Sequence, residues 1–175
     1  DWLTWLEFRR VLFRSDRVKF LHKVVIINSA SGQPQALILK RASDASSRPN
    51  AWDLPGGNAE WPAKMQESAA NLHQLDIARE VKEESHLTVD PKLFNLDHLV
   101  YFSSYFEADR QIYTIICGWA VEFRETDQAD ISISDEHQAQ AWISRDELDN
   151  YDFAGEKGQF IKEMISSAFI KYNHQ

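Results

Sequence analysis

Three glutamates lie close together in the segment AREVKEESHL, which covers residues 78–87. If this segment is helical, Glu80, Glu83 and Glu84 stand at positions i, i+3 and i+4 and share one helix face. Like charges at this spacing repel each other, by about 0.2–0.5 kcal/mol per pair on an exposed helix. Arg79 can pair with Glu83, but one guanidinium cannot neutralise three carboxylates. A divalent cation such as Mg²⁺, which prefers carboxylate oxygens and keeps some of its waters, would reverse the repulsion.

Two interpretations of this acidic cluster are open. Charge runs usually cover a solvated helix face, and the glutamates could do no more than that. However, a Gly-Gly pair, Gly56 and Gly57, precedes the helix in the segment AWDLPGGNAEW. Glycine lets the backbone approach a ligand closely and leaves a carbonyl oxygen free for coordination. Such an oxygen, the carboxylates and retained waters would together form a Mg²⁺ site for phosphate chemistry by metal-activated water.

The predicted strands and helices alternate along the chain. Runs rich in β-branched and aromatic residues predict strands, and a 3.6-residue apolar period predicts helices. The expected strands are residues 18–29, 36–41, 93–108, 111–123 and 139–143, and the expected helices are residues 67–85 and 155–172, with a short helix after a capping box at Ser144 and Glu147. This order predicts one mixed α/β (α+β) domain with helices on both sides of a sheet.

The helix that carries the glutamates also shows an apolar stripe. Leu75, Ala78 and Val81 recur at i, i+3 and i+6, roughly opposite the three glutamates. We therefore expect these three residues to pack inward and the carboxylates to face outward.

Composition excludes several classes of protein. The chain has 175 residues, 43% hydrophobic and 26% charged, which is ordinary for one globular domain. No apolar run is long enough to span a bilayer, so we expect no membrane partner. The formal net charge of -8 argues against a binder of nucleic-acid polymers, which needs a basic surface. The single cysteine, Cys117, excludes an internal disulfide framework and predicts a reducing compartment, the cytoplasm.

The start of the chain differs in character from the rest. The segment LEFRRVLFRS is similar to the conceptual translation of a common sequencing-adapter oligonucleotide. We therefore interpret residues 1–15 as an artefactual extension and expect a single domain over residues 16–175. A basic amphipathic arm that binds a membrane or a partner is the alternative interpretation.

The Gly-Gly turn and the acidic segment together resemble the signature box of the Nudix hydrolases, G-x5-E-x7-R-E-U-x-E-E-x-G-U, where U is a bulky aliphatic residue. Gly57 matches the opening glycine, whose carbonyl often binds metal in the family. Arg79 matches the arginine that orients the glutamates. The three metal-binding or base glutamates of the box match Glu80, Glu83 and Glu84.

The chain departs from this box in its spacing. Gly57 and Arg79 are 22 positions apart, where the pattern has 14. The first glutamate of the pattern then falls on Ala63 or on Asn71, depending on the end from which one counts. The candidates for its role are Glu60 and Glu67, unless the role is vacant. We place the insertion near residues 61–68 and expect it to reshape the substrate mouth.

A second departure is His86, which occupies the position of the last glycine in the box. That glycine would end the helix in a left-handed conformation, for which histidine is a costlier but tolerated residue.

The resemblance implies a fold, a cofactor and a reaction. The fold is an α/β/α sandwich with a mixed central sheet, here over about residues 18–170. The reaction is Mg²⁺-dependent hydrolysis of a pyrophosphate bond in a nucleoside diphosphate linked to another group, with Mn²⁺ as an alternative ion. The metal ligands would be Gly57, Glu80, Glu83 and Glu84.

The resemblance also implies a base and partners. Glu136 is a candidate base, because family members often supply a further acid from this loop. The partner is a small nucleotide, and a homodimer is an option because many relatives dimerise.

Two other residues are weaker candidates for substrate binding. Arg41, at the end of the second strand, could meet phosphates, although surface arginines are common. Trp52 could stack a nucleobase, although aromatic residues in strands more often belong to the core. The missing first glutamate and the insertion also leave an alternative function open, a Nudix-like binding or regulatory module that has lost turnover.

Overall fold

The computed structural model describes residues 18–30, 32–60, 70–123 and 131–173. The predicted artefactual segment 1–15 and the predicted insertion at residues 61–68 lie outside these residues, so both interpretations stay predictions.

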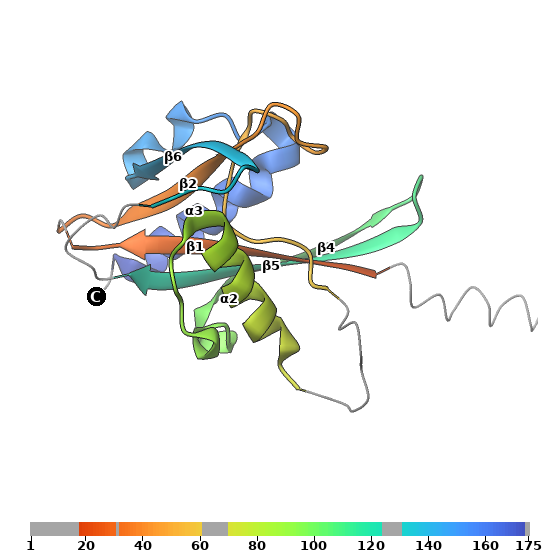
Figure 1. Ribbon diagram of the computed structural model, residues 1–175, viewed down its shortest axis with the longest axis horizontal. Helices are drawn as coiled ribbons and strands as arrows, with labels where there is room; N and C mark the ends of the chain where they lie inside the picture. The colour runs from red at the N-terminus through yellow and green to blue at the C-terminus, as the bar shows by residue number, and fades with distance from the viewer. Residues whose placement is uncertain (1–17, 31, 61–69, 124–130, 174–175) are drawn as a thin grey trace, which may run out of the picture.

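One mixed sheet of six strands organises the described residues (Figure 1). Its strands run in the order β3-β2-β1-β5-β4, and β6 pairs with β2. The strands β1 and β5 are parallel, and the other strand pairs are antiparallel. The strands are β1 (Val18–Asn28), β2 (Gln35–Arg41), β3 (Trp52–Asp53), β4 (Leu99–Glu107), β5 (Ile112–Phe123) and β6 (His137–Ile143).

In the described part of the chain, two α-helices lie on opposite faces of this sheet. They are α2 (Leu72–Ser85) and α3 (Gln159–Tyr172), and the short 3-10 helices are Pro91–Leu93, Leu96–His98, Arg145–Asn150 and Gly155–Gly158. The predicted α/β (α+β) sandwich with a mixed central sheet is therefore confirmed. Within the described ranges, no helix combines the length and the apolar character that crossing a membrane requires.

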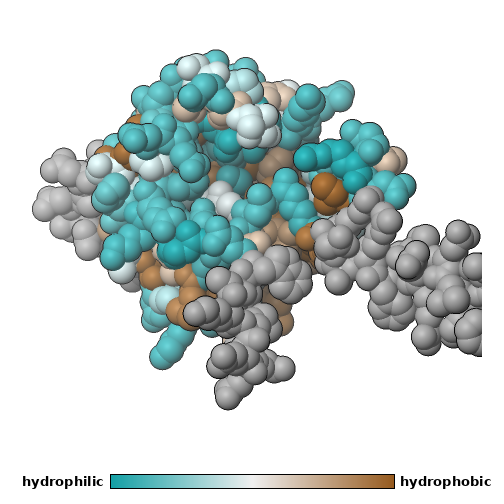
Figure 2. All heavy atoms as spheres, turned by 45° about the vertical axis from the view of Figure 1, so that its right-hand side comes forward, coloured by the Kyte–Doolittle hydropathy of each residue, from teal (hydrophilic) through white to brown (hydrophobic). Residues whose placement is uncertain are grey.

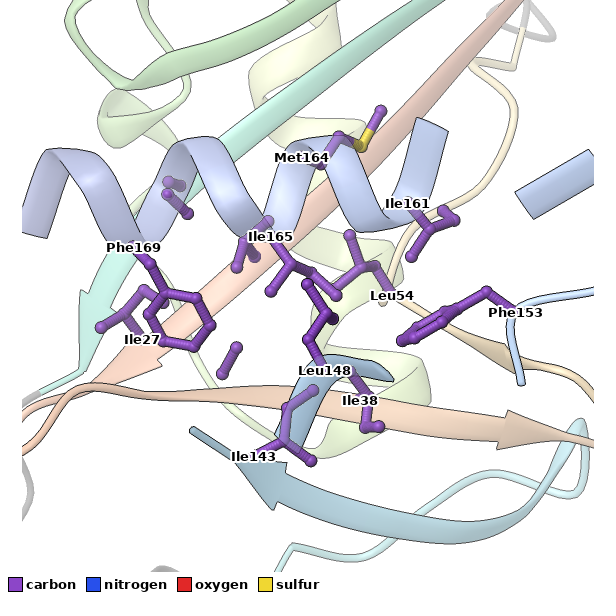
Figure 3. Close-up of a cluster of buried hydrophobic side chains, with 14 of the residues drawn as sticks. Ile27, Ile38, Leu54, Ile143, Leu148, Phe153, Ile161, Met164, Ile165 and Phe169 are labelled. Carbon is purple, nitrogen blue, oxygen red and sulfur yellow. The ribbon is translucent and has the colours of Figure 1, made fainter. Parts of the chain in front are cut away.

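Alternation along β1 divides the core into two clusters. Val25 and Ile27 point to the α3 side, whereas Val24 and Ile26 point to the α2 side. Figure 3 shows the α3 side, where Ile161, Met164, Ile165 and Phe169 of the helix meet strand residues such as Ile27, Ile38 and Ile143. The space-filling view of Figure 2 shows mainly hydrophilic residues on the face that it draws, with apolar residues in small patches between them.

The helix α2 buries a different face from the predicted one. Ile77 and Val81 are buried, and Glu84 is only 8% exposed, whereas Leu75 is 64% exposed. The predicted apolar stripe is therefore wrong for Leu75. The residues that are actually buried, Ile77, Val81 and Glu84, stand at i, i+4 and i+7, and a row with the spacing i, i+3 and i+6 drifts away from that face. The expectation that all three carboxylates face outward is also wrong, because Glu84 lies on the inward row.

The predicted β1–β2 pairing exists but is short. Only Ile27 and Asn28 pair with the start of β2. Further back, the same edge of β1 pairs with the Gly-Gly segment, because the amide of His22 donates to the carbonyl of Gly57 over 2.9 Å. The sheet thereby fixes the loop that leads to the glutamate helix.

Candidate active site

The Gly-Gly turn is fastened to β1 by three backbone hydrogen bonds. The amides of His22 and Val24 donate to the carbonyls of Gly57 and Pro55, and the amide of Ala59 donates to the carbonyl of Phe20. Because β1 lies in the middle of the sheet, these bonds give the turn a rigid support. The carbonyl of Gly57 keeps one lone pair for a further partner.

Both glycines of the turn have a steric reason to be glycine. Gly56 has a φ of 122°, and a Cβ atom there would lie 2.4 Å from the carbonyl oxygen of His22. At Gly57, a Cβ atom would lie 2.8 Å from Oε2 of Glu80. Gly56 therefore permits the turn, and Gly57 permits the Glu80 carboxylate to lie directly against the backbone.

Glu84 connects the helix to the same turn. Its Oε2 accepts a hydrogen bond of 2.7 Å from the amide of Gly56. Burial raises the pKa of Glu84 from 4.5 to about 7, against the opposing effects of Lys23 and of the Gly56 amide; Asp53 and Glu80 add repulsion. A carboxyl group with a pKa near neutrality can accept a proton and release it again at physiological pH.

Arg79 forms ion pairs with three other carboxylates of the helix. Its guanidinium lies 2.5 Å from Asp76, 2.7 Å from Glu80 and 2.7 Å from Glu83. The hydrogen bond with Asp76 and the charges of Glu80 and Glu83 raise the pKa of Arg79. Arg79 thus holds two of the three box carboxylates, Glu80 and Glu83, in a defined orientation.

A buried ion cluster supports the turn. The Nζ of Lys23 donates to Oδ2 of Asp53 (3.1 Å) and to the carbonyls of Leu54 (2.9 Å) and Gly56 (2.8 Å), which uses all three of its protons. Burial alone would raise the pKa of Asp53, but the charges of Lys23 and Arg48 and the Leu54 amide hold it below its usual range.

The donor set fits a hard divalent ion. All candidate donors are oxygens, and the Glu80 carboxylate lies against the Gly57 backbone. Burial raises the pKa of Glu80 despite Arg79, and the charge of Glu83 raises it further. A cation between these groups would relieve that repulsion. Among the described residues, no group of three acidic, histidine or cysteine side chains is already arranged around one metal position.

A profile of the NUDIX domain family matches residues 21–164, which is most of the chain. The chain belongs to the Nudix family. No protein in the curated set matches the chain significantly. The Nudix domain places the protein among the pyrophosphohydrolases, and this family acts on small nucleotide derivatives.

Solved Nudix structures share the fold at low sequence identity. The MutT protein from Methanosarcina mazei has a TM-score of 0.61 at 19% identity, with 90% of this chain and 96% of that chain covered. An Ap4A hydrolase from C. elegans, solved as a binary complex, has a TM-score of 0.53 at 21% identity, with 86% and 98% covered. The NUDIX domain of Shewanella oneidensis NrtR, complexed with ADP ribose, has a TM-score of 0.61 at 12% identity, with 87% and 86% covered.

The two predicted substrate-binding residues of this Nudix domain are both engaged in structural contacts. Arg41 donates to Oδ2 of Asp53 over 3.2 Å and to the carbonyl of Ser47, so it belongs to the buried ion cluster. Trp52 meets the ring of Tyr151 edge to face, with 5.1 Å between ring centroids, and packs on the α3 side of the sheet. Their roles toward a substrate stay predictions.

The loop of Glu136 lies beside the end of the Nudix helix. The amide of Ser134 approaches the carbonyl of Glu84 at 3.4 Å, whereas the Glu136 side chain is exposed. The next residue, His137, is buried, and burial together with the charge of Lys23 lowers its pKa to about 4. The structure thus brings Gly57, Glu80 and Glu84 together, and it places Glu136 in a neighbouring loop.

The departures from the Nudix box have structural counterparts. Glu60, one candidate for the first box glutamate, lies near Arg79, with 3.7 Å between Oε2 of Glu60 and Nη2 of Arg79. The backbone amide of Glu60 donates a hydrogen bond to Asp76. Glu67 lies outside the described residues, and the assignment of Glu60 or Glu67 to the first box glutamate stays a prediction. His86 has a φ of 59° and ends α2 in the left-handed conformation that the box glycine predicts.

Sequence reasoning missed several residues that shape the site. Asp76 shares Arg79 with the glutamates, and its signal was the i, i+3 spacing from that arginine. Lys23 is a charged residue inside an otherwise apolar strand, which is itself a signal because lysine is almost never buried without a partner. Asp53 carries no local sequence signal that we can name.

The raised pKa of Glu84 predicts how the stability of the metal-free protein depends on pH. Because this pKa is 4.5 in a model peptide and about 7 in the folded chain, the folded state keeps a proton that the unfolded state releases between these values. The contribution of Glu84 to stability therefore falls as pH rises through this window. Glu84→Gln should be more stable than the wild type by roughly 1–3 kcal/mol at pH 8, and no more stable at pH 4.

Denaturant unfolding in EDTA at the two pH values measures this difference. Glu163→Gln is the matched control, because Glu163 is exposed, and its difference from the wild type should not change with pH. A stability difference for Glu84→Gln that is the same at pH 4 and pH 8 would contradict the burial argument.

Proposed function

We propose that this Nudix domain is a Mg²⁺-dependent hydrolase that cleaves a pyrophosphate bond in a nucleoside diphosphate linked to another group. The observation that carries the proposal is the convergence of the Gly57 backbone, the Glu80 carboxylate and the buried Glu84 carboxylate at one rigid turn. The NUDIX match and the donor chemistry support it.

The residues of the chain have distinct roles in this proposal. Gly57, Glu80, Glu83 and Glu84 would hold the ion, and Mn²⁺ is an alternative to Mg²⁺. When bound, the ion supplies neutralisation of phosphate charge and a water of lowered pKa. Arg79 orients Glu80 and Glu83.

A group of suitable basicity is also needed to accept the proton of the attacking water. Glu84, whose pKa is about 7, meets that requirement when one of its carboxylate oxygens is not a ligand of the ion. Glu136 is the other candidate, because its loop adjoins the end of α2 at Ser134 and Glu84. The pH profile of turnover in Glu136→Gln separates these two candidates. If Glu136 is the base, the variant loses the fall in turnover at low pH that protonation of the base causes; if Glu84 is the base, that fall remains.

The experiment is turnover on a panel of nucleoside diphosphate derivatives, with Mg²⁺, with Mn²⁺ and with EDTA. The panel includes dinucleoside polyphosphates and ADP ribose, because relatives that share this fold are an Ap4A hydrolase and a domain complexed with ADP ribose. We expect metal-dependent release of a nucleoside monophosphate from at least one member. No metal-dependent product from any member, with the protein folded, would contradict the proposal.

A binding or regulatory module without turnover is the second candidate. It is favoured by the extended spacing between Gly57 and Arg79 and by the absence, among the described residues, of a preformed three-ligand cluster. Ligand binding without product release on the same panel would support it.

We further propose a cytoplasmic, single-domain protein that binds neither membranes nor nucleic-acid polymers. A homodimer is the oligomeric state to test by light scattering.

The close approach of Glu80 to Gly57 predicts the effect of Gly57→Ala. The new Cβ would meet Oε2 of Glu80 at 2.8 Å, which is the flexible end of a side chain. We therefore expect a small loss of stability, below about 1 kcal/mol, and a drop in turnover of about tenfold, because the displaced carboxylate no longer lies at the backbone.

Gly56→Ala is the contrasting variant. Its Cβ would meet backbone at 2.4 Å, and its φ of 122° is unfavourable for alanine. We expect it to lower the stability more than Gly57→Ala does, as measured by thermal unfolding. Full turnover in Gly57→Ala would show that the approach of Glu80 to this glycine does not matter.

A further inference from the structure

The strand β4 forms a long edge of the sheet. It has the sequence LVYFSSYFE and pairs with β5 on one side, and no other strand in the described part of the chain pairs with its outer side. Such an edge offers unpaired backbone donors and acceptors, which proteins usually protect with lysine, proline or a covering segment. β4 contains neither lysine nor proline, and its hairpin with β5 extends beyond the rest of the described fold (Figure 1). This edge is therefore suited to pairing with a strand of another chain.

The same hairpin has an exposed apolar face. Phe102 and Phe106 of β4 are 64% and 55% exposed, and Tyr113 of β5 and Val18 of β1 are 45% and 47% exposed. Phe106 lies opposite Tyr113, and Tyr113 lies opposite Val18, so these side chains share one side of the sheet. Phe102 lies opposite Cys117, a member of the α2-side core cluster, which places this hairpin patch of four residues on the α2 side. Large apolar side chains that gather on a surface mark an interaction site.

The hairpin patch is uncharged in a strongly acidic chain. Its four residues, Val18, Phe102, Phe106 and Tyr113, carry no charge, whereas the whole chain has a formal net charge of -8. Two copies of this chain repel each other where their acidic surfaces meet. Contact through an uncharged face avoids that repulsion, and it offers no charge complementarity to a cationic or anionic partner. The patch therefore favours a second copy of this chain as its occupant.

The sequence of β4 is also suited to pairing with itself. In a two-fold antiparallel pair centred on Ser104, Phe102 of each copy lies opposite Phe106 of the other. This register brings the two most exposed aromatic rings of β4 together across the interface, and aromatic cross-strand pairs stabilise a sheet. A shift of the centre to Ser103 would place Phe102 opposite Ser104 and lose this pairing. The register centred on Ser104 therefore buries the patch best.

A recess lies beside the aromatic projections on the same face. Phe102 lines a pocket of about 470 Å³, together with Phe94, Leu96 and Trp119 among its other walls. None of the residues that line this pocket is an aspartate, glutamate, lysine or arginine. In the register centred on Ser104, Phe106 of the second copy stands beside Phe102 and next to this pocket. A projection and a recess on one face are what a self-complementary two-fold contact requires.

We infer that this protein forms a two-fold dimer by antiparallel pairing of β4 with β4 of a second copy, which buries the hairpin patch. A fully buried aromatic side chain covers about 150–250 Å², so the exposed fractions of the three rings leave roughly 300 Å² of ring surface per copy, in addition to the paired backbone. An interface of this size is typical of weak, reversible association. The inference goes beyond the proposed hydrolysis and does not rest on it, because none of these residues belongs to the candidate active site.

Sedimentation velocity of the full chain over a range of concentrations tests the inference. We expect a monomer at low and a dimer at high micromolar concentration, with an affinity that does not weaken as salt increases, because the contact is uncharged. Phe102→Ser and Phe106→Ser should each weaken dimerisation about tenfold or more. Neither variant should lower the thermal midpoint, because both side chains are exposed.

Ile170→Ser is the matched control for these two variants. Ile170 is 52% exposed but lies on α3, outside the hairpin patch, so this variant should dimerise like the wild type. A wild type that stays monomeric at every concentration would overturn the inference. So would a dimer that neither Phe102→Ser nor Phe106→Ser weakens.

A cysteine cross-link tests the register. In a pair centred on Ser104 this residue lies opposite itself, with roughly 5 Å between the two Cβ atoms, which a small adjustment brings within reach of a disulfide. With oxidised glutathione as the electron acceptor, Ser104→Cys should form a covalent dimer on non-reducing electrophoresis. Ser46→Cys, at an exposed loop position, and the wild type, whose single cysteine Cys117 is buried, should stay unlinked. Linkage of Ser104→Cys no faster than that of Ser46→Cys would overturn the pairing of β4 about Ser104.

Discussion

Glu80→Gln should lower metal-dependent turnover by about 100-fold or more, because it removes the carboxylate that lies against the Gly57 backbone. A glutamine at this position keeps the size of the side chain but supplies one neutral oxygen, which binds a hard divalent ion far more weakly. Glu80 also pairs with Arg79 over 2.7 Å, so the variant weakens the orientation of the neighbouring Glu83 as well.

The structure predicts little loss of stability in this variant. Glu80 is partly exposed, and burial raises its pKa, so its charge is not a strong source of stability without metal. Turnover at saturating substrate over a range of Mg²⁺ concentrations is the measurement, with Glu163→Gln as an exposed control. Turnover within threefold of the wild type at every Mg²⁺ concentration would remove Glu80 from the metal site.

Lys23→Met should lower the free energy of unfolding by about 3–5 kcal/mol. The lysine is 4% exposed, and its ammonium group satisfies Asp53 and two backbone carbonyls. Methionine fills similar space but donates nothing, so the carbonyls of Leu54 and Gly56 lose a partner in a buried place. Asp53 keeps Arg41 and Arg48, which limits the loss.

Denaturant unfolding monitored by tryptophan fluorescence measures this effect. Lys82→Met is the matched control, because Lys82 lies on the exposed face of α2, and its change should stay within about 0.5 kcal/mol. Turnover of Lys23→Met at a temperature where it remains folded should also fall, since the Gly56 carbonyl loses its anchor. A loss of stability below 1 kcal/mol would show that the cluster does not support the turn.

Local patterns in the sequence predicted much of the fold. The β4–β5 hairpin, the glutamate helix and the helix near the end of the chain follow from hydrophobic period and turn chemistry, which act over a few residues. The capping box at Ser144 is also present, since Glu147 accepts hydrogen bonds from the Ser144 amide and hydroxyl. The last helix begins at Gln159 instead of residue 155, because a 3-10 turn precedes it.

The errors concern contacts between distant segments. Lys23 and Asp53 are 30 positions apart, and only the folded sheet shows that they meet. The shortness of the β1–β2 pairing has a similar cause, because the Gly-Gly segment takes backbone hydrogen bonds along the same edge of β1. Burial of Glu84 depends on which helix face meets the sheet, and the predicted apolar stripe included Leu75, which is in fact exposed.

The most direct test of the central claim is a Mn²⁺ titration of the metal-free chain, in which the electron paramagnetic resonance signal reports free Mn²⁺. The proposed site predicts saturable binding to the wild type that Mg²⁺ displaces, that weakens at least about tenfold in Glu80→Gln and in Glu84→Gln, and that is unchanged in Glu163→Gln. Mn²⁺ binding of equal affinity in all four proteins would contradict the claim that the turn and the glutamate helix hold the catalytic metal.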